Sequence, residues 1–78
     1  MKPSLGRVVL MKVDAAQNNG SDTAHASITR VWNDGMVNIR VMLDAFTMPL
    51  WMTSVALFDT EDEAVVHGSY ACWWPPRV

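Results

Sequence analysis

Apolar side chains occupy every second position between residues 36 and 43; they are Val37, Ile39, Val41 and Leu43. Successive side chains of a β-strand point to opposite faces, so this spacing predicts a strand with one buried face. Asn38 and Arg40 fall between the apolar positions. We therefore expect Asn38 and Arg40 to point away from the core.

Four other segments are rich in β-branched, aromatic or other apolar residues, and we expect each to be extended. They are Arg7–Val13, His25–Trp32, Leu50–Phe58 and a final piece from about Tyr70 to Trp74. The intervening segments are loops: polar Ala15–Thr23, the connection Asp44–Pro49, which contains Phe46 and Met48, and acidic Asp59–Glu63. Only Glu61–Val66 is suited to a helical turn.

Five short strands with brief turns predict an all-β fold, specifically a small five-stranded SH3-like barrel, with an OB-like barrel as the alternative. The chain has 78 residues, which is enough for one domain covering 1–78. A chain of this size buries only about 60% of its unfolded surface. Half of its residues are apolar, and Cys72 is its single cysteine, so no disulfide can staple it. We therefore expect a homodimer or a higher homo-oligomer.

The dipeptide Asp34-Gly35 between two apolar runs is a strong signal for a β-hairpin. A two-residue loop would pair Trp32 with Val37 and turn Arg30 inward. A three-residue loop with a glycine bulge would instead pair Val31 with Val37 and send Trp32 and Arg30 outward. The sequence leaves both registers open.

The formal net charge is −2, from six basic and eight acidic residues. No basic stripe of the kind that neutralises duplex DNA is visible, so binding to duplex nucleic acid is disfavoured. The apolar run Val8–Met11 is too short for a signal peptide or a membrane span. We expect a cytoplasmic protein that does not contact a membrane.

Four tryptophans are more than the interior of so small a barrel should hold, so we expect two in the core and two at a surface or a subunit interface. Trp73 and Trp74 are adjacent, and an extended chain would place one of them on or near the surface. An exposed indole can stack on a nucleobase. Trp73, Trp74 and Trp51 are the candidate stacking residues.

Four of the six basic residues are arginines, whose planar guanidinium groups suit phosphate and carboxylate ligands. Any one of them is most simply a solvated charge on a strand. Arg40, Arg30 or Arg77 beside Trp73 or Trp74 would nevertheless form a pocket for an anion of nucleotide size. The histidines and Cys72 lack the spacing of a metal site or a catalytic triad. We expect no enzymatic activity, no metal and no cofactor.

Three segments resemble a family of small proteins found in tailed-phage and prophage genomes. The segments are Arg30–Val41, Thr53–Val55 and Gly68–Pro75, which are similar to the "VWND…MVNLRV" hairpin, the "TSV" strand and the closing "G-x-YAEWMP" of that family. Gly6-Arg7 matches a Gly-Arg near the start of its members. Cys72 departs from the pattern, which carries an acid there. The resemblance implies a viral origin and a small size rather than an activity.

The sequence thus predicts a phage-type, non-enzymatic protein that binds a ligand through tryptophan and arginine. The specific hypothesis is a sponge that sequesters a nucleotide-derived immune signal of the host, which would be an anti-defence function. The alternative is a protein-interaction module that docks its aromatic C-terminal segment on a host or virion protein. Weak binding of single-stranded nucleic acid by an OB-like face is a third possibility, against which the negative charge argues.

Overall fold

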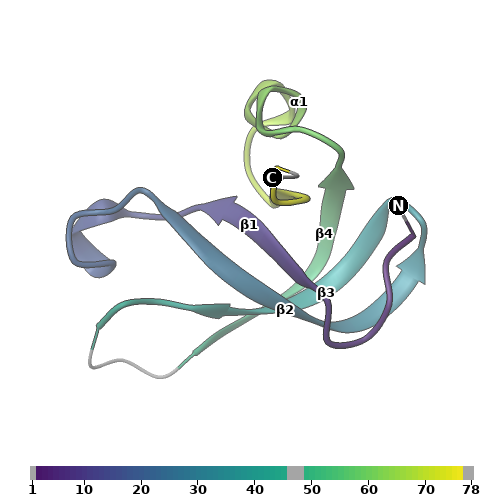
Figure 1. Ribbon diagram of the computed structural model, residues 1–78, viewed down its shortest axis with the longest axis horizontal. Coiled ribbons are helices and arrows are strands. Elements are labelled where there is room, and N and C mark those ends of the chain that lie inside the picture. The colour runs from purple at the N-terminus through teal and green to yellow at the C-terminus, as the bar shows by residue number, and fades with distance from the viewer. Residues whose placement is uncertain (1, 46–48, 77–78) are drawn as a thin grey trace.

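The computed structural model describes residues 2–45 and 49–76 and contains five strands, one α-helix and one short 3₁₀ helix. In chain order the elements are β1 (Val8–Lys12), η1 (Ala15–Gln17), β2 (Thr23–Asn33), β3 (Met36–Met42), β4 (Leu50–Phe58), α1 (Glu61–His67) and β5 (Ala71–Trp73). The strands close into one barrel (Figure 1). The expected five-stranded all-β barrel of the small SH3-like or OB-like kind is confirmed.

The strands follow one another around the barrel in chain order. The pairs β1–β2, β2–β3 and β3–β4 are antiparallel, whereas β5 runs parallel to β4. The barrel closes where Leu10 of β1 pairs with Trp73 of β5. This order lacks the Greek-key crossing of an OB-fold, which fits the SH3-like expectation.

The core is built from alternate positions on the strands. Val37, Ile39 and Val41 are fully buried, as their spacing predicted, and Leu43 is partly buried against the same cluster. Residues of this main core come from every strand, with Trp74 beyond the end of β5; they are Val9, Met11, Ala24, Ala26, Ile28, Val37, Ile39, Val41, Val55, Leu57, Cys72 and Trp74.

The helix α1 connects β4 to β5 and lies against both of them (Figure 1). It begins after Thr60, whose hydroxyl oxygen accepts a hydrogen bond from the backbone N–H of Glu63 at 3.4 Å. Three acidic residues in its first turn interact favourably with the positive, N-terminal end of the helix dipole. The helical turn expected at Glu61–Val66 is confirmed, one residue longer at its C-terminal end.

The polar loop between β1 and β2 is fastened by Asn18, which is buried although its neighbours are exposed. Its amide nitrogen donates to the backbone oxygens of Ser21 and Thr23 at 3.0 and 3.1 Å. Its amide oxygen accepts from the backbone N–H of Asp44 at 2.6 Å. The loop is therefore tied to the end of β3. Phe46 and Met48, in the same connection as Asp44, lie outside the described residues.

Candidate functional site

The four tryptophans divide into a buried pair and an exposed pair. Trp73 and Trp74 are 3% and 7% exposed, whereas Trp32 and Trp51 are 49% and 53% exposed. The expectation of two core and two surface indoles is confirmed. The expectation that Trp73 or Trp74 reaches the surface is wrong.

The reason for that error is α1. Trp74 enters the main core, while the neighbouring Trp73 points to the other side of the chain. There it packs with Ala64 of α1 and Ala71, in a second small core that Leu10 and Phe58 border. Alternation along the strand holds, but a helix covers the face that the sequence left open. Two adjacent indoles are therefore both buried, in two different clusters.

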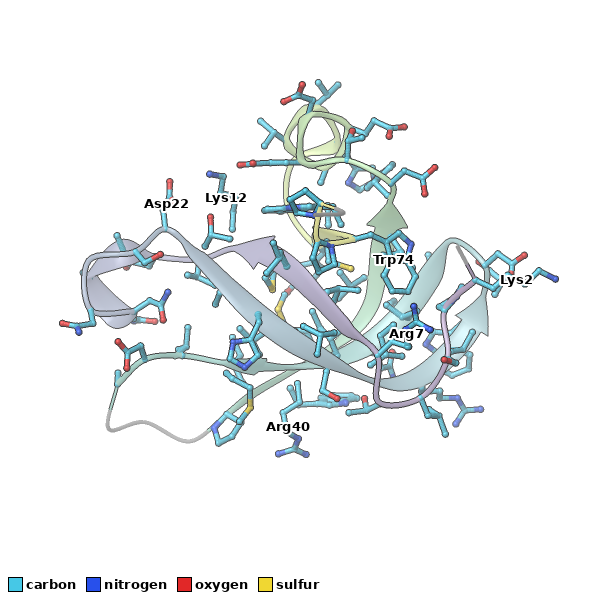
Figure 2. The ribbon with its side chains drawn as sticks, in the orientation of Figure 1. Lys2, Arg7, Lys12, Asp22, Arg40 and Trp74 are labelled. Carbon is cyan, nitrogen blue, oxygen red and sulfur yellow. The ribbon has the colours of Figure 1, made fainter. Side chains whose placement is uncertain are left out.

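The hollow beside Trp73 and Trp74 has the wrong charge for an anionic ligand. Its volume is about 280 Å³, and the acidic residues Asp59, Glu61 and Asp62 are part of its lining. The guanidinium of Arg7 lies 5.6 Å from the centre of the Trp74 ring, whereas Arg40 points away from the barrel on the side opposite α1 (Figure 2) and Arg30 stacks on Trp32. The predicted pocket of Trp73 or Trp74 with those arginines is not formed. Arg77, the other candidate partner, lies outside the described residues.

Two other predicted site residues do come together. Arg40 of β3 and Trp51 of β4 are direct cross-strand partners. Directly opposed residues of antiparallel strands share a face, with their Cβ atoms about 5 Å apart. Both side chains are exposed, and Figure 2 shows Arg40 pointing away from the barrel on the side opposite α1. The outward orientation predicted for Arg40 is confirmed.

The hairpin register places Arg30 and Trp32 on this same outer face. Val31 pairs with Val37 and Asn33 with Met36, so the turn is the two-residue Asp34-Gly35 and the extra residue on β2 is Trp32. The pairing of the second predicted register is confirmed, but the bulged residue is Trp32 rather than a glycine. A second irregularity lies between Ile28 and Arg30.

Arg30 and Trp32 then stack on each other. The guanidinium carbon of Arg30 lies 4.1 Å from the centre of the Trp32 ring, which is a cation–π contact. Both residues are exposed. The stack holds the charge of Arg30 outside the barrel without a carboxylate partner at that contact.

Asn38 is the polar centre of the face, and it is 6% exposed although it points outward. Its amide oxygen accepts from the Trp32 indole N–H at 2.8 Å, from the Thr53 hydroxyl at 2.9 Å and from the backbone N–H of Ser54 at 2.9 Å. Thr53 and Ser54 together oppose Asn38, because β4 is irregular between the Val37 and Ile39 pairings. Ser54 adopts a left-handed φ of 58° there. Asn38 thus holds in place both the Trp32 indole and the Thr53–Ser54 bulge of β4.

We call this surface the Trp–Arg face; its residues are Arg30, Trp32, Asn38, Arg40 and Trp51. Trp32 and Asn38 were not among the predicted site residues. The signal that could have found Trp32 was the outward register, in which it accompanies Arg30. Nothing local marks Asn38, because its importance depends on two bulges contributed by other strands.

Charge is segregated across the molecule. The three strands β2, β3 and β4 carry Arg30, Arg40 and His25 but no acidic residue. Four of the eight acids lie between residues 59 and 63, around the start of α1. Lys12 of β1 is drawn to that side, with its ammonium 3.1 Å from a carboxylate oxygen of Glu61 and 3.2 Å from one of Asp22. The whole chain has a net charge of −2, but strands β2, β3 and β4 carry no acidic residue. We call these three strands the acid-free sheet.

The single thiol is enclosed. Cys72 is fully buried, and its burial raises the pKa of the thiol to about 12, so little of the nucleophilic thiolate forms at neutral pH.

Among residues 2–45 and 49–76, no group of three or more His, Cys, Asp or Glu side chains is arranged to hold a metal ion. Within the same residues, no helix has the length and apolarity needed to cross a membrane.

Comparison with known proteins adds no relative: no protein-family model, curated protein or solved structure matches the chain. The Trp–Arg face is therefore interpreted from its own geometry.

Proposed function

We propose that this is a non-enzymatic binding protein whose Trp–Arg face takes a ligand that combines a nucleobase with phosphate. The observation that carries the proposal is the meeting of two exposed indoles and two exposed guanidinium groups on adjoining strands without acids. Indoles stack on bases, and guanidinium groups bind phosphate oxygens through paired hydrogen bonds. The acid-free sheet adds no repulsion against such an anion.

The geometry supports a division of roles between the two indoles. Trp32 is already engaged, because Arg30 covers one side of its ring and Asn38 accepts its N–H. No described aromatic or cationic group stacks on the Trp51 ring, which is 53% exposed. We assign Trp51 to stacking on the base and Arg40, its cross-strand neighbour, to a phosphate. Arg30 is the second phosphate ligand.

In its narrower form, the proposal is that the protein sequesters a nucleotide-derived immune signal, as a phage protein directed against host defence would. The resemblance to tailed-phage proteins supplies this setting. Sequestration requires a small ligand to be largely enclosed. The Trp–Arg face is open, so this form requires a second subunit that covers the ligand.

Isothermal titration calorimetry tests the proposal directly. The ligands are cyclic dinucleotides, cyclic trinucleotides, isomers of cyclic ADP-ribose and short single-stranded oligonucleotides. We expect at least one class to bind, with Trp51→Ala weakening the affinity about tenfold or more, since a base–aromatic stack contributes roughly 1–3 kcal/mol. Tyr70→Ala, which removes an exposed aromatic ring near α1, should leave affinity unchanged.

The arginines are tested separately. Arg40→Ala should weaken binding and reduce its dependence on salt, because a phosphate contact is lost. Lys2→Ala removes one exposed positive charge that lies apart from Arg40 (Figure 2) and is the matched control. Absence of binding heat with every ligand class would rule out the proposal.

One observation favours a second function, namely a protein-interaction module. Val65, Val66 and Tyr70 are 53%, 87% and 61% exposed, and they lie on or just after α1. Of the aromatic C-terminal segment, only Tyr70 is accessible, so the alternative requires this apolar surface rather than the two indoles. Capture of one host or virion protein that Val66→Glu abolishes, without loss of fold, would support it.

A further inference from the structure

The first half of β4 is an open edge of the barrel. On one side β3 pairs with Leu50, Trp51, Met52 and Val55, whereas on the other side β5 pairs with β4 only from Ala56 to Phe58. Backbone hydrogen bonds outside the regular strand pairings reach Ala56 and Leu57, from Tyr70 and Gly35, but no described backbone group bonds to the outer edge of residues 50–53. Among residues 2–45 and 49–76, the outward N–H and C=O groups of this segment have no backbone partner, so they are available to pair with another strand.

This edge is only weakly protected: the Thr53–Ser54 bulge limits its open part to residues 50–53 and Pro49 precedes it, but no charge guards it. Natural edge strands are usually short, charged, interrupted by proline or covered. The nine residues of β4 include no charged residue and no proline. Leu50 and Trp51 are 50% and 53% exposed at its start. An uncharged apolar edge of this kind is a site for strand addition.

We propose that a second copy of the chain covers this edge, with the two β4 strands paired antiparallel about a two-fold axis. Identical strands can pair in this way without complementary charges, and β4 carries none that would repel its own copy. A charged partner strand would gain no ion pair from β4. The pairing would also bury part of Leu50, whose side chain is 50% exposed in the single chain. Burying apolar surface stabilises association, and half of the residues of this small barrel are apolar.

The symmetry has a consequence for the Trp–Arg face. A two-fold axis that pairs two equal edges antiparallel is perpendicular to the sheet, so the outer faces of both copies lie on the same side. Strands β2, β3 and β4 of the two copies would form one continuous sheet. Its outer face would carry two sets of Trp51 and Arg40, adjacent across the new strand pair. This joined site rests on the proposed function, whereas the dimer itself does not.

Sedimentation equilibrium over a series of protein concentrations tests the dimer. The wild type should approach twice the 8.7 kDa mass of one chain. Leu50→Lys places a charge on the edge and should raise the dimer dissociation constant about tenfold or more. Leu5→Lys is the matched control, because Leu5 is 70% exposed and precedes β1, and its dissociation constant should equal that of the wild type. Far-UV circular dichroism verifies that both variants fold.

Amide hydrogen exchange identifies the interface. Outward amides of residues 50–53 should be protected in the wild type and exchange freely in Leu50→Lys at the same concentration. A wild type that stays monomeric at every concentration would overturn the proposal, as would a dimer in which those amides are unprotected. Protection that arises only after an unrelated β-strand peptide is added would also overturn it, in favour of a foreign partner. Ligand titrations of the Leu50→Lys monomer test nucleotide binding independently of the dimer.

Discussion

Asn38 offers the sharpest test of how the Trp–Arg face is held, and we predict that Asn38→Ala strongly destabilises the fold. Its amide oxygen accepts hydrogen bonds from Trp32, Thr53 and Ser54. The Asn38 side chain is itself buried, at 6% exposed, and serves all three donors at once. A donor left without a partner costs about 1–3 kcal/mol where water cannot reach it.

Water lowers that cost here. Trp32, Thr53 and Ser54 are exposed residues, so water can replace Asn38 at a net cost of about 1 kcal/mol for each hydrogen bond. The whole change should therefore lower the free energy of unfolding by about 2–3 kcal/mol. For a domain of this size, the midpoint of thermal unfolding should fall by roughly 10–20 °C.

Urea denaturation followed by tryptophan fluorescence measures this loss. Asn33→Ala is the matched control, because the Asn33 amide oxygen accepts one hydrogen bond, from the backbone N–H of Gly35 at 2.9 Å, at an exposed turn. The control should lose only about 0.5–1 kcal/mol. If Asn38→Ala and Asn33→Ala were equally stable, Asn38 would not organise the face. Near-UV circular dichroism should also weaken in Asn38→Ala, because the indole of Trp32 loses its anchor.

Three further predictions concern the other tryptophans, the buried thiol and the link to α1. Trp73→Ala should cost about 3–5 kcal/mol by emptying the second core, which circular dichroism would register as extensive unfolding, whereas Trp51→Ala should stay within about 0.5 kcal/mol of the wild type. Burial raises the pKa of Cys72 from 9.0 to about 12, so the unfolded chain releases this proton first and the free energy of unfolding falls as pH rises between those values. Urea titrations over that range should show a shallower fall for Cys72→Ala, and equal slopes would contradict the assignment. Lys12→Met should loosen α1 from β1, detected as faster amide exchange in Glu61–His67, whereas Lys2→Met should not.

The exposed pair of indoles shows what the sequence could and could not predict. Counting four tryptophans against a small interior correctly predicts two inside and two outside. Choosing which two required the position of α1, because a seven-residue helix closes over the face to which Trp73 points. The adjacent pair looked the more accessible and proved the more buried.

Local pattern by itself determined the five strands, the Asp34-Gly35 hairpin and the buried face of residues 37–41, because side-chain alternation and turn preferences act between near neighbours in the chain. Tertiary structure alone decided the two bulges, the burial of Asn38 and the charge segregation that leaves three adjoining strands without an acid. Each of these depends on pairing between residues distant in sequence. A shift of one residue in such a pairing exchanges the inner and outer faces of a strand. The observed register between β2 and β3 therefore places Arg30 and Trp32 outside the barrel, beside Asn38.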